Sequence, residues 1–265
     1  MNDSLLRIGA LMLRYYYLIR GSWPRLLEQA YWPTVQMIIW GFITKFMAGQ
    51  SGWVAQAAGV FIAAVLLWDT VFRSQLGVFL AFIEEVYARN LGQLFVSPLR
   101  PWEMIAGMIG ISFFRTLFGV GVAALLAVPL FGYSILGLGL PLVALFGNLL
   151  VFGWAMGLLV AAMLLRYGLG AESIGWASIF ALAPLSGIYY PIATLPDWLQ
   201  PVAFALPTAH VFEGMRQIMF EQQLPVGHLL AAAALNVGYL ALGAGVFLWV
   251  FRIARERGLL LQQGE

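Results

Sequence analysis

Apolar residues along this chain are grouped into long runs that polar or proline-containing segments separate. Six such runs cover about 28–48, 57–82, 104–129, 139–163, 174–192 and 228–251. Each is close to the roughly 20 apolar residues that an α-helix needs to cross the hydrocarbon core of a bilayer. The pattern predicts an all-α integral membrane protein in which residues 1–265 form one domain of six transmembrane helices.

The N-terminal segment, residues 1–25, follows a different pattern. Its apolar side chains recur at helical spacing, but Arg7, Arg14 and Arg20 interrupt them. A helix with this many charges is expected to lie in the membrane interface rather than to span the bilayer. The same arginines argue against a cleavable signal peptide, whose central region is apolar.

Residues 193–227 are too polar for a span and too apolar for a solvated loop. They combine four prolines, which break any long helix, with large side chains that need burial. Backbone that enters lipid must satisfy its own hydrogen bonds or be covered by protein. We therefore predict a re-entrant segment of two short helices, around 196–204 and 208–220, in the outer leaflet.

Charge and composition refine this view. The chain is 62% hydrophobic and only 10% charged, whereas soluble domains carry about 25% charged residues. Arginines concentrate in the N-terminal segment, in residues 83–103, at Arg166 and in the C-terminal tail, and the other side of the membrane keeps only Lys45 and Arg216. Basic residues stay on the cytoplasmic side, so both termini are predicted to be cytoplasmic in a multi-pass inner-membrane protein. Membrane lipids, not nucleic acid, are the expected surroundings.

Catalytic signatures are missing from the sequence. The only lysine, Lys45, lies between Thr44 and Phe46, so the glycine-lysine-serine/threonine core of a phosphate-binding loop is absent. The chain has no cysteine, and His210 and His228 have no neighbouring cluster of metal ligands in the sequence. We expect no catalytic residue, no bound metal and no cofactor of the chain's own.

Residues 83–103, between the second and third runs, form a polar hinge that still carries large apolar residues. They read as a short amphipathic helix stopped by Pro98. A merely solvated connector is possible, but docking of another protein is favoured because it would cover Leu94 and Phe95. The candidate docking residues are Glu85, Arg89, Asn90, Leu94, Phe95, Ser97, Pro98 and Arg100.

Three charged residues lie well away from the ends of the predicted spans, where a charge is costly and often functional. Asp69 and Arg73 are four residues apart and can pair on one helix face. Arg115 is expected at a similar depth on the next span, so the three are predicted to meet. A structural ion-pair lock and a polar wall of a substrate path explain them equally well.

Two segments resemble the permease subunit of a type-2 ATP-binding cassette (ABC) exporter. The first is Gln93-Leu-Phe-Val-Ser-Pro-Leu99, followed by Trp102 and Glu103. The second is Leu185-Ser-Gly-Ile-Tyr-Tyr-Pro191 with Leu195-Pro-Asp-Trp-Leu-Gln200, continued by Leu206, Pro207, His210, Glu213 and Arg216. Gly92 departs from the family, which commonly has a second acidic residue at that position.

The resemblance implies a homodimer of permeases gripped by two copies of a separate cytoplasmic ATPase, which would bind ATP and Mg. It implies export, and the 15% aromatic content suits an amphipathic, lipid-linked, glycan or drug-like substrate. An ion-coupled secondary transporter is the alternative, and an integral-membrane enzyme is disfavoured for lack of reactive residues. A cap at the exit of the path is predicted from Tyr190, Trp198, His210, Glu213 and Arg216, with a hydrogen-bond cluster as the favoured role for the last three.

Overall fold

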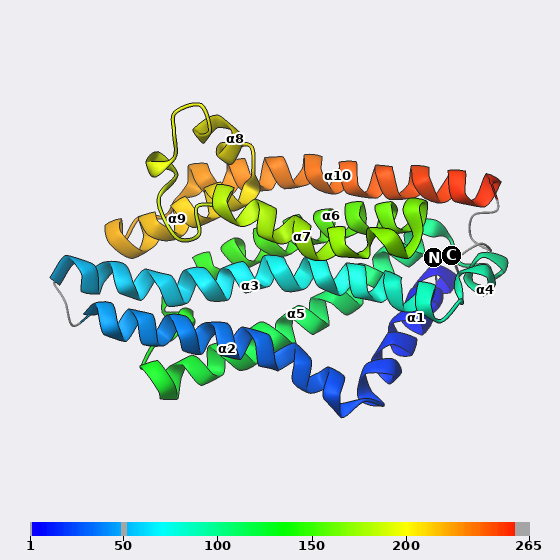
Figure 1. Cartoon of the computed structure of the whole chain (residues 1–265), viewed down its shortest axis with the longest axis horizontal. Coiled ribbons are helices and arrows are strands. Elements are labelled where there is room, and N and C mark those ends of the chain that lie inside the picture. Colours follow the sequence, from blue (N-terminus) through cyan, green and yellow to red (C-terminus); the bar gives the residue numbers. More distant parts are fainter. Residues whose placement is uncertain (1, 49–51, 258–265) are drawn as a thin grey trace.

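The computed structural model describes residues 2–48 and 52–257, and helices are the only regular secondary structure in this part of the chain (Figure 1). The all-α prediction is confirmed. In chain order the helices are α1 (Asn2–Arg20), α2 (Trp23–Ala48), α3 (Gly52–Tyr87), α4 (Leu91–Val96), α5 (Pro101–Phe131), α6 (Pro141–Tyr167), α7 (Glu172–Leu182), α8 (Gln200–Phe204), α9 (Pro207–Glu221) and α10 (Val226–Glu256), with 3-10 turns at Ile135–Leu138, Gly168–Ala171, Ala183–Leu185 and Ile192–Thr194.

Four stretches of helix are long and apolar enough to cross a membrane: Val60–Tyr87, Pro101–Phe131, Pro141–Leu185 and Val226–Glu256. The third of these includes both α6 and α7, between which the chain turns at Gly168. Helix α2 has 26 residues, a length of about 39 Å at 1.5 Å per residue, but it is not among these four. The prediction of six long apolar helices is thus met in part.

The fifth predicted span, residues 174–192, is wrong as a continuous helix. Helix α7 ends at Leu182 after 11 residues, a length of about 16 Å, which is near half of a hydrocarbon core of about 30 Å. Pro184 lacks the N–H that a continuing helix would need, and Gly187 adopts a φ of 70° that favours glycine. The chain therefore leaves the helix and continues through an irregular turn.

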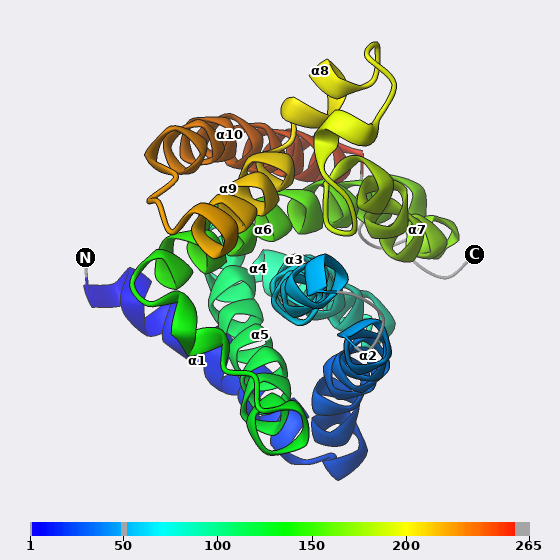
Figure 2. The same cartoon turned by 90° about the vertical axis from the view of Figure 1, so that its left-hand side faces the viewer.

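Helix α6 lies at the centre of the bundle, with α3 on one side and α10 on the other (Figure 2). Gly153 and Gly157 permit the close approach of α3, because a Cβ at Gly153 would overlap Ser74 and one at Gly157 would meet Val78 at 2.7 Å. Gly243 does the same for α10, since a Cβ there would lie 2.6 Å from the carbonyl oxygen of Ala155. Glycines in α6 and α10 thus allow both neighbouring helices to pack closely against α6.

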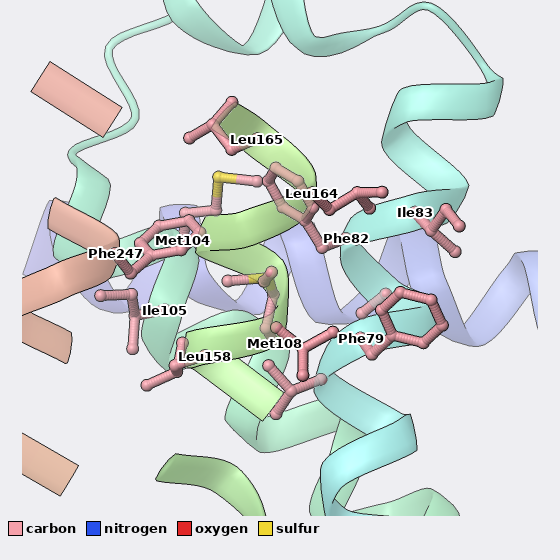
Figure 3. Close-up of a cluster of buried hydrophobic side chains, with 14 of the residues drawn as sticks. Phe79, Phe82, Ile83, Met104, Ile105, Met108, Leu158, Leu164, Leu165 and Phe247 are labelled. Carbon is pink, nitrogen blue, oxygen red and sulfur yellow. The ribbon is translucent and has the colours of Figure 1, made fainter. Parts of the chain in front are cut away.

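Buried apolar side chains form one large cluster toward each end of the bundle. The cluster nearer α4 draws side chains from α3, α5, α6 and α10, including Phe79, Phe82, Met108, Leu158 and Phe247 (Figure 3). The rings of Phe82 and Phe247 meet edge to face at 5.7 Å, an arrangement that aromatic pairs favour. Leu11, Tyr15 and Ile19 of α1 complete this cluster, so α1 is packed onto the bundle along one face.

The connection between α7 and α10 contains two short helices near the predicted positions. Helix α8 covers Gln200–Phe204 and α9 covers Pro207–Glu221, against the predicted ranges of 196–204 and 208–220. Both lie toward the end of the bundle opposite α4, and α8 stands outside the main helices (Figures 1 and 2). Their depth in a bilayer stays a prediction.

Candidate functional site

Helix α4 connects α3 to α5 at the end of the bundle where α1 begins and α10 ends (Figure 1). The preceding turn is tight because Arg89 adopts a φ of 51°. After α4, the Ser97 hydroxyl donates to the Leu94 carbonyl at 2.6 Å and accepts the Leu99 N–H at 3.3 Å. The helix thus ends before Pro98, as predicted. The two hydrogen bonds of Ser97 fix the conformation of the backbone that follows α4.

The apolar residues of α4 divide between the core and the surface. Leu91 is buried, and Leu94 is half-buried against the cluster nearer α4. Val96, in contrast, is 90% exposed. The side chain of Phe95 lies outside the described part of the structure. Val96 is therefore the described apolar side chain of α4 most available to a partner, and the sequence analysis did not single it out.

The polar residues predicted to dock a partner also divide. Arg89, Pro98 and Arg100 are exposed, whereas Asn90 and Ser97 are half-buried. Glu85 is fully buried, so its assignment to direct docking is corrected. Its carboxylate lies inside the protein because two partners hold it there: Arg14 Nη1 at 2.7 Å and Asn90 Nδ2 at 2.8 Å, both to Oε2.

A second buried carboxylate, Glu103, lies at the other end of the hinge, in the first turn of α5. Arg7 binds it with two parallel bonds, Nε to Oε2 at 2.9 Å and Nη2 to Oε1 at 2.7 Å. The Arg100 N–H also donates to Oε2 at 2.8 Å. This hydrogen-bonded ion pair raises the pKa of the Arg7 guanidinium. Two-point pairing of this kind fixes geometry as well as charge.

Arg7 and Arg14 belong to one helix and hold opposite sides of α4. Seven residues separate them, about two helical turns, so both project from the same face of α1. We call the two pairs, Arg7–Glu103 and Arg14–Glu85, the hinge clamp. The sequence analysis assigned these arginines to the interface only; the two carboxylates at the borders of the hinge were the available signal for their partners.

The intramembrane charges do not form the predicted three-residue cluster. Arg73 Nε donates to Asp69 Oδ2 at 2.9 Å, which agrees with the predicted pairing on one face of α3. Arg115 instead pairs with Glu84 at 3.2 Å, and Glu84 is also 3.4 Å from Arg25. Glu84 lies eleven residues beyond Arg73 on α3, about 16 Å along the axis. The long side chain of Arg115 reaches Glu84, near the end of α3 that leads into α4.

Several polar atoms around these pairs are buried without a hydrogen-bond partner in the described part of the chain. They include Arg73 Nη2, Arg115 Nε and Thr116 Oγ1. A buried donor without a partner is unfavourable, and such groups inside a membrane are commonly functional. The region between α3 and α5 therefore has unused hydrogen-bonding capacity.

At the other end of the bundle, Glu213 and Arg216 of α9 hold the irregular turn that follows α7. Arg216 Nη1 pairs with Glu213 at 3.2 Å, and Nη2 donates to the carbonyl oxygens of Gly187 and Tyr190, the latter at 3.0 Å. Glu213 accepts the Ile192 N–H at 2.6 Å. The favoured interpretation of these two residues, a hydrogen-bond cluster, is thus supported by the contacts of the turn.

The remaining cap residues are placed separately. His210 Nδ1 lies 3.2 Å from Nδ1 of His228 on α10, and its Nε2 lies 3.0 Å from the Phe204 carbonyl oxygen. Tyr190 donates its hydroxyl proton to the Pro184 carbonyl at 2.7 Å. Trp198 is 74% exposed. Burial lowers the pKa of His210, so its neutral form is favoured.

Long apolar helices packed in a bundle define a multi-pass membrane protein. The family model of the ABC-2 type transporter matches residues 14–220, which includes both the hinge and the turn held by Arg216. The chain belongs to this family and is a permease of the ABC transporter class. No curated protein sequence matches the chain. Membership implies partnership with an ABC ATPase subunit.

Proposed function

We propose that this chain is the membrane-spanning subunit of an ATP-driven exporter, working as a homodimer with two copies of a separate ATPase that binds ATP and Mg. The observation that carries this proposal is the hinge: Val96 is 90% exposed on a short helix whose two borders are fixed by the hinge clamp. A rigid support under an exposed apolar residue suits a site that must transmit force.

The proposed orientation places α4 and both termini in the cytoplasm of the inner membrane. Arg89 and Arg100 beside α4, and Arg252 and Arg255 at the end of α10, are exposed at this end of the bundle. Retention of arginine on the cytoplasmic side favours this orientation. ATP binding would then close the paired ATPases, move α4 through its contact with them, and rearrange the spans in alternating access.

The proposed substrate is an amphipathic, lipid-linked, glycan or drug-like molecule. Asp69, Arg73 and Arg115 would line part of its path, which is supported by the unpartnered donors Arg73 Nη2, Arg115 Nε and Thr116 Oγ1. On the outer side, α8 and α9 would fold into the outer leaflet and cap the exit. Arg216 donates hydrogen bonds to the carbonyl oxygens of Gly187 and Tyr190 in the irregular turn. Lipid has no groups that could make these hydrogen bonds.

The experiment that tests this proposal is co-purification with an ABC ATPase, sought first in the reading frames that neighbour this one. Val96→Asp should abolish co-purification and permease-dependent ATP hydrolysis while leaving the permease folded in the membrane. Leu140→Asp is the matched control, because Leu140 is 88% exposed at the opposite end of the bundle. Transport that persists without an ATPase and follows an ion gradient would instead favour a secondary transporter.

A further inference from the structure

A surface pocket lies at the end of the bundle that carries α4, where the last turns of α10 meet the start of α5. Its volume is about 580 Å³, and it is lined by Pro101, Leu248, Phe251, Arg252, Arg255 and Glu256. This volume is in the range typical of small-ligand sites, about 300–1,000 Å³. The docking role of α4 and the transport path do not account for it.

The lining has two chemical parts. Leu248 and Phe251 supply an apolar wall on the side that continues into the long apolar helix α10. Arg252 and Arg255, three residues apart and so on one side of that helix, supply positive charge at its end. The pocket thus offers an apolar surface beside a cationic one. An amphiphile could place its apolar part on the first and its anionic headgroup on the second.

The cationic side is available to a ligand. Arg252 pairs with Glu256 at 2.9 Å, but both side chains are largely exposed, 80% and 61%, and such surface pairs are weak. Arg255 forms no ion pair within the residues that the structure describes. One acidic and two basic side chains leave the lining with a net positive charge.

We propose that this pocket binds the phosphate headgroup of an anionic glycerophospholipid from the cytoplasmic leaflet. Arg252 and Arg255 contact the phosphate, and the acyl chains run along the apolar wall from Leu248. Basic pockets between transmembrane helices on the cytoplasmic side recognise anionic lipid headgroups. The assignment rests on the proposed orientation and goes beyond the proposed transport function.

The position of the pocket connects a bound lipid to the hinge. Pro101 and Phe251 also line a small cavity beside Leu94, Leu99 and Arg100, so the two pockets share a wall. A lipid in the larger pocket therefore contacts Pro101 and Phe251, the two residues that also line the small cavity beside α4. Bound lipid stabilises the docking end of the permease, and lipid composition then acts on the ATPase through α4.

The test measures binding of phosphatidylglycerol to the purified full chain in an uncharged detergent, with phosphatidylcholine as the neutral comparison. Arg252→Gln/Arg255→Gln should weaken phosphatidylglycerol binding about 25-fold, near five-fold for each arginine at a membrane surface. Arg257→Gln is the matched control: this arginine follows the pocket in sequence but does not line it, so its loss should weaken binding clearly less than the loss of either pocket arginine.

Glu256→Gln gives a result of the opposite sign. Removing this carboxylate frees Arg252 and raises the positive charge of the pocket, so phosphatidylglycerol should bind more tightly. A misfolded variant would not bind more tightly, so this arm is independent of folding defects. ATPase co-purification, measured in parallel, separates failure of this inference from failure of the proposed function.

Three outcomes would overturn the assignment. Equal weakening by Arg257→Gln would show attraction to general surface charge rather than to the pocket. Full competition by inorganic phosphate at millimolar concentration would make the ligand a free anion. Loss of ATPase binding in the double variant with unchanged lipid affinity would assign the pocket to an acidic side chain of the ATPase.

Discussion

Arg14 and Glu85 are joined across 71 positions of sequence, with Nη1 and Oε2 2.7 Å apart. The Glu85 carboxylate is fully buried, while Arg14 is 34% exposed. Together with Arg7 and Glu103, this pair makes α1 a support for the hinge rather than an independent surface helix. The mechanical role of α1 follows from this contact.

The hinge clamp predicts that Arg14→Gln is destabilising. The variant leaves the buried Glu85 carboxylate with only Asn90 as a partner, at a cost of about 3 kcal/mol, the lower end of the range for a broken buried pair. The lower end applies because water reaches Arg14. Thermal unfolding of the purified permease measures this change.

The control for this prediction is Arg252→Gln, which breaks an exposed pair and should alter stability by less than about 1 kcal/mol. Adding Glu85→Gln to Arg14→Gln should recover part of the loss, because it removes the unpaired charge. If the double variant is less stable than Arg14→Gln alone, the clamp is not an energetic unit.

Leu94 and Val96 should respond differently to substitution. Leu94→Asp places a charge against the core cluster and should lower both stability and ATPase binding, whereas Val96→Asp should lower ATPase binding alone. Unfolding temperature and pull-down, measured on the same preparations, separate the two effects. Equal loss of stability in both variants would contradict the observed division of α4 into a core side and an exposed side.

The two intramembrane ion pairs should act independently. Asp69→Asn leaves Arg73 unpaired, and Arg115→Gln leaves Glu84 with the more exposed Arg25; each should be destabilising by a few kcal/mol. Since they share no partner, their effects should add within about 0.5 kcal/mol in a double-mutant cycle. An interaction energy between the two substitutions above about 1 kcal/mol would instead support the predicted cluster of Asp69, Arg73 and Arg115.

Stability should fall in acid because of the histidine pair. When Nε2 of neutral His210 carries the proton and donates to the Phe204 carbonyl oxygen, its Nδ1 accepts a hydrogen bond from the Nδ1–H of His228. Burial lowers the pKa of His210 below its ordinary 6.5, so its stabilising contribution is present above pH 6.5 and is lost as the pH falls below that value. As the pH is lowered from about 8 to 5, the unfolding temperature of the wild type should fall, and that of His210→Gln should change less.

Single cysteines can test the depth of the segment between α7 and α10, since the native chain has no cysteine. A cysteine replacing Phe212, which is fully buried, should resist an impermeant thiol reagent, and one replacing the exposed Gln223 should react. Trp198 is 74% exposed in the isolated chain, so a cysteine there is protected only by lipid or a second subunit. Rapid labelling at Trp198 would contradict the re-entrant arrangement.

Hydrophobic runs were sufficient to predict an all-α membrane protein and the positions of most long helices. The same approach failed at residues 174–192, because apolar composition continues past Leu182 while Pro184 and Gly187 end the helix. It placed α9 closely, since Pro207 marks its first turn and polar residues mark its end. Local sequence therefore determined the kind of element and, where prolines intervene, its borders.

Only the tertiary structure decided which charges meet. The sequence placed Asp69, Arg73 and Arg115 at similar depth, but the fold sends Arg115 to Glu84 and brings Arg14 to Glu85. Helical spacing fixes partners three or four residues apart, as for Asp69 and Arg73. Partners on different helices depend on the rotation and tilt with which those helices pack, which are set by side-chain fit along their whole length.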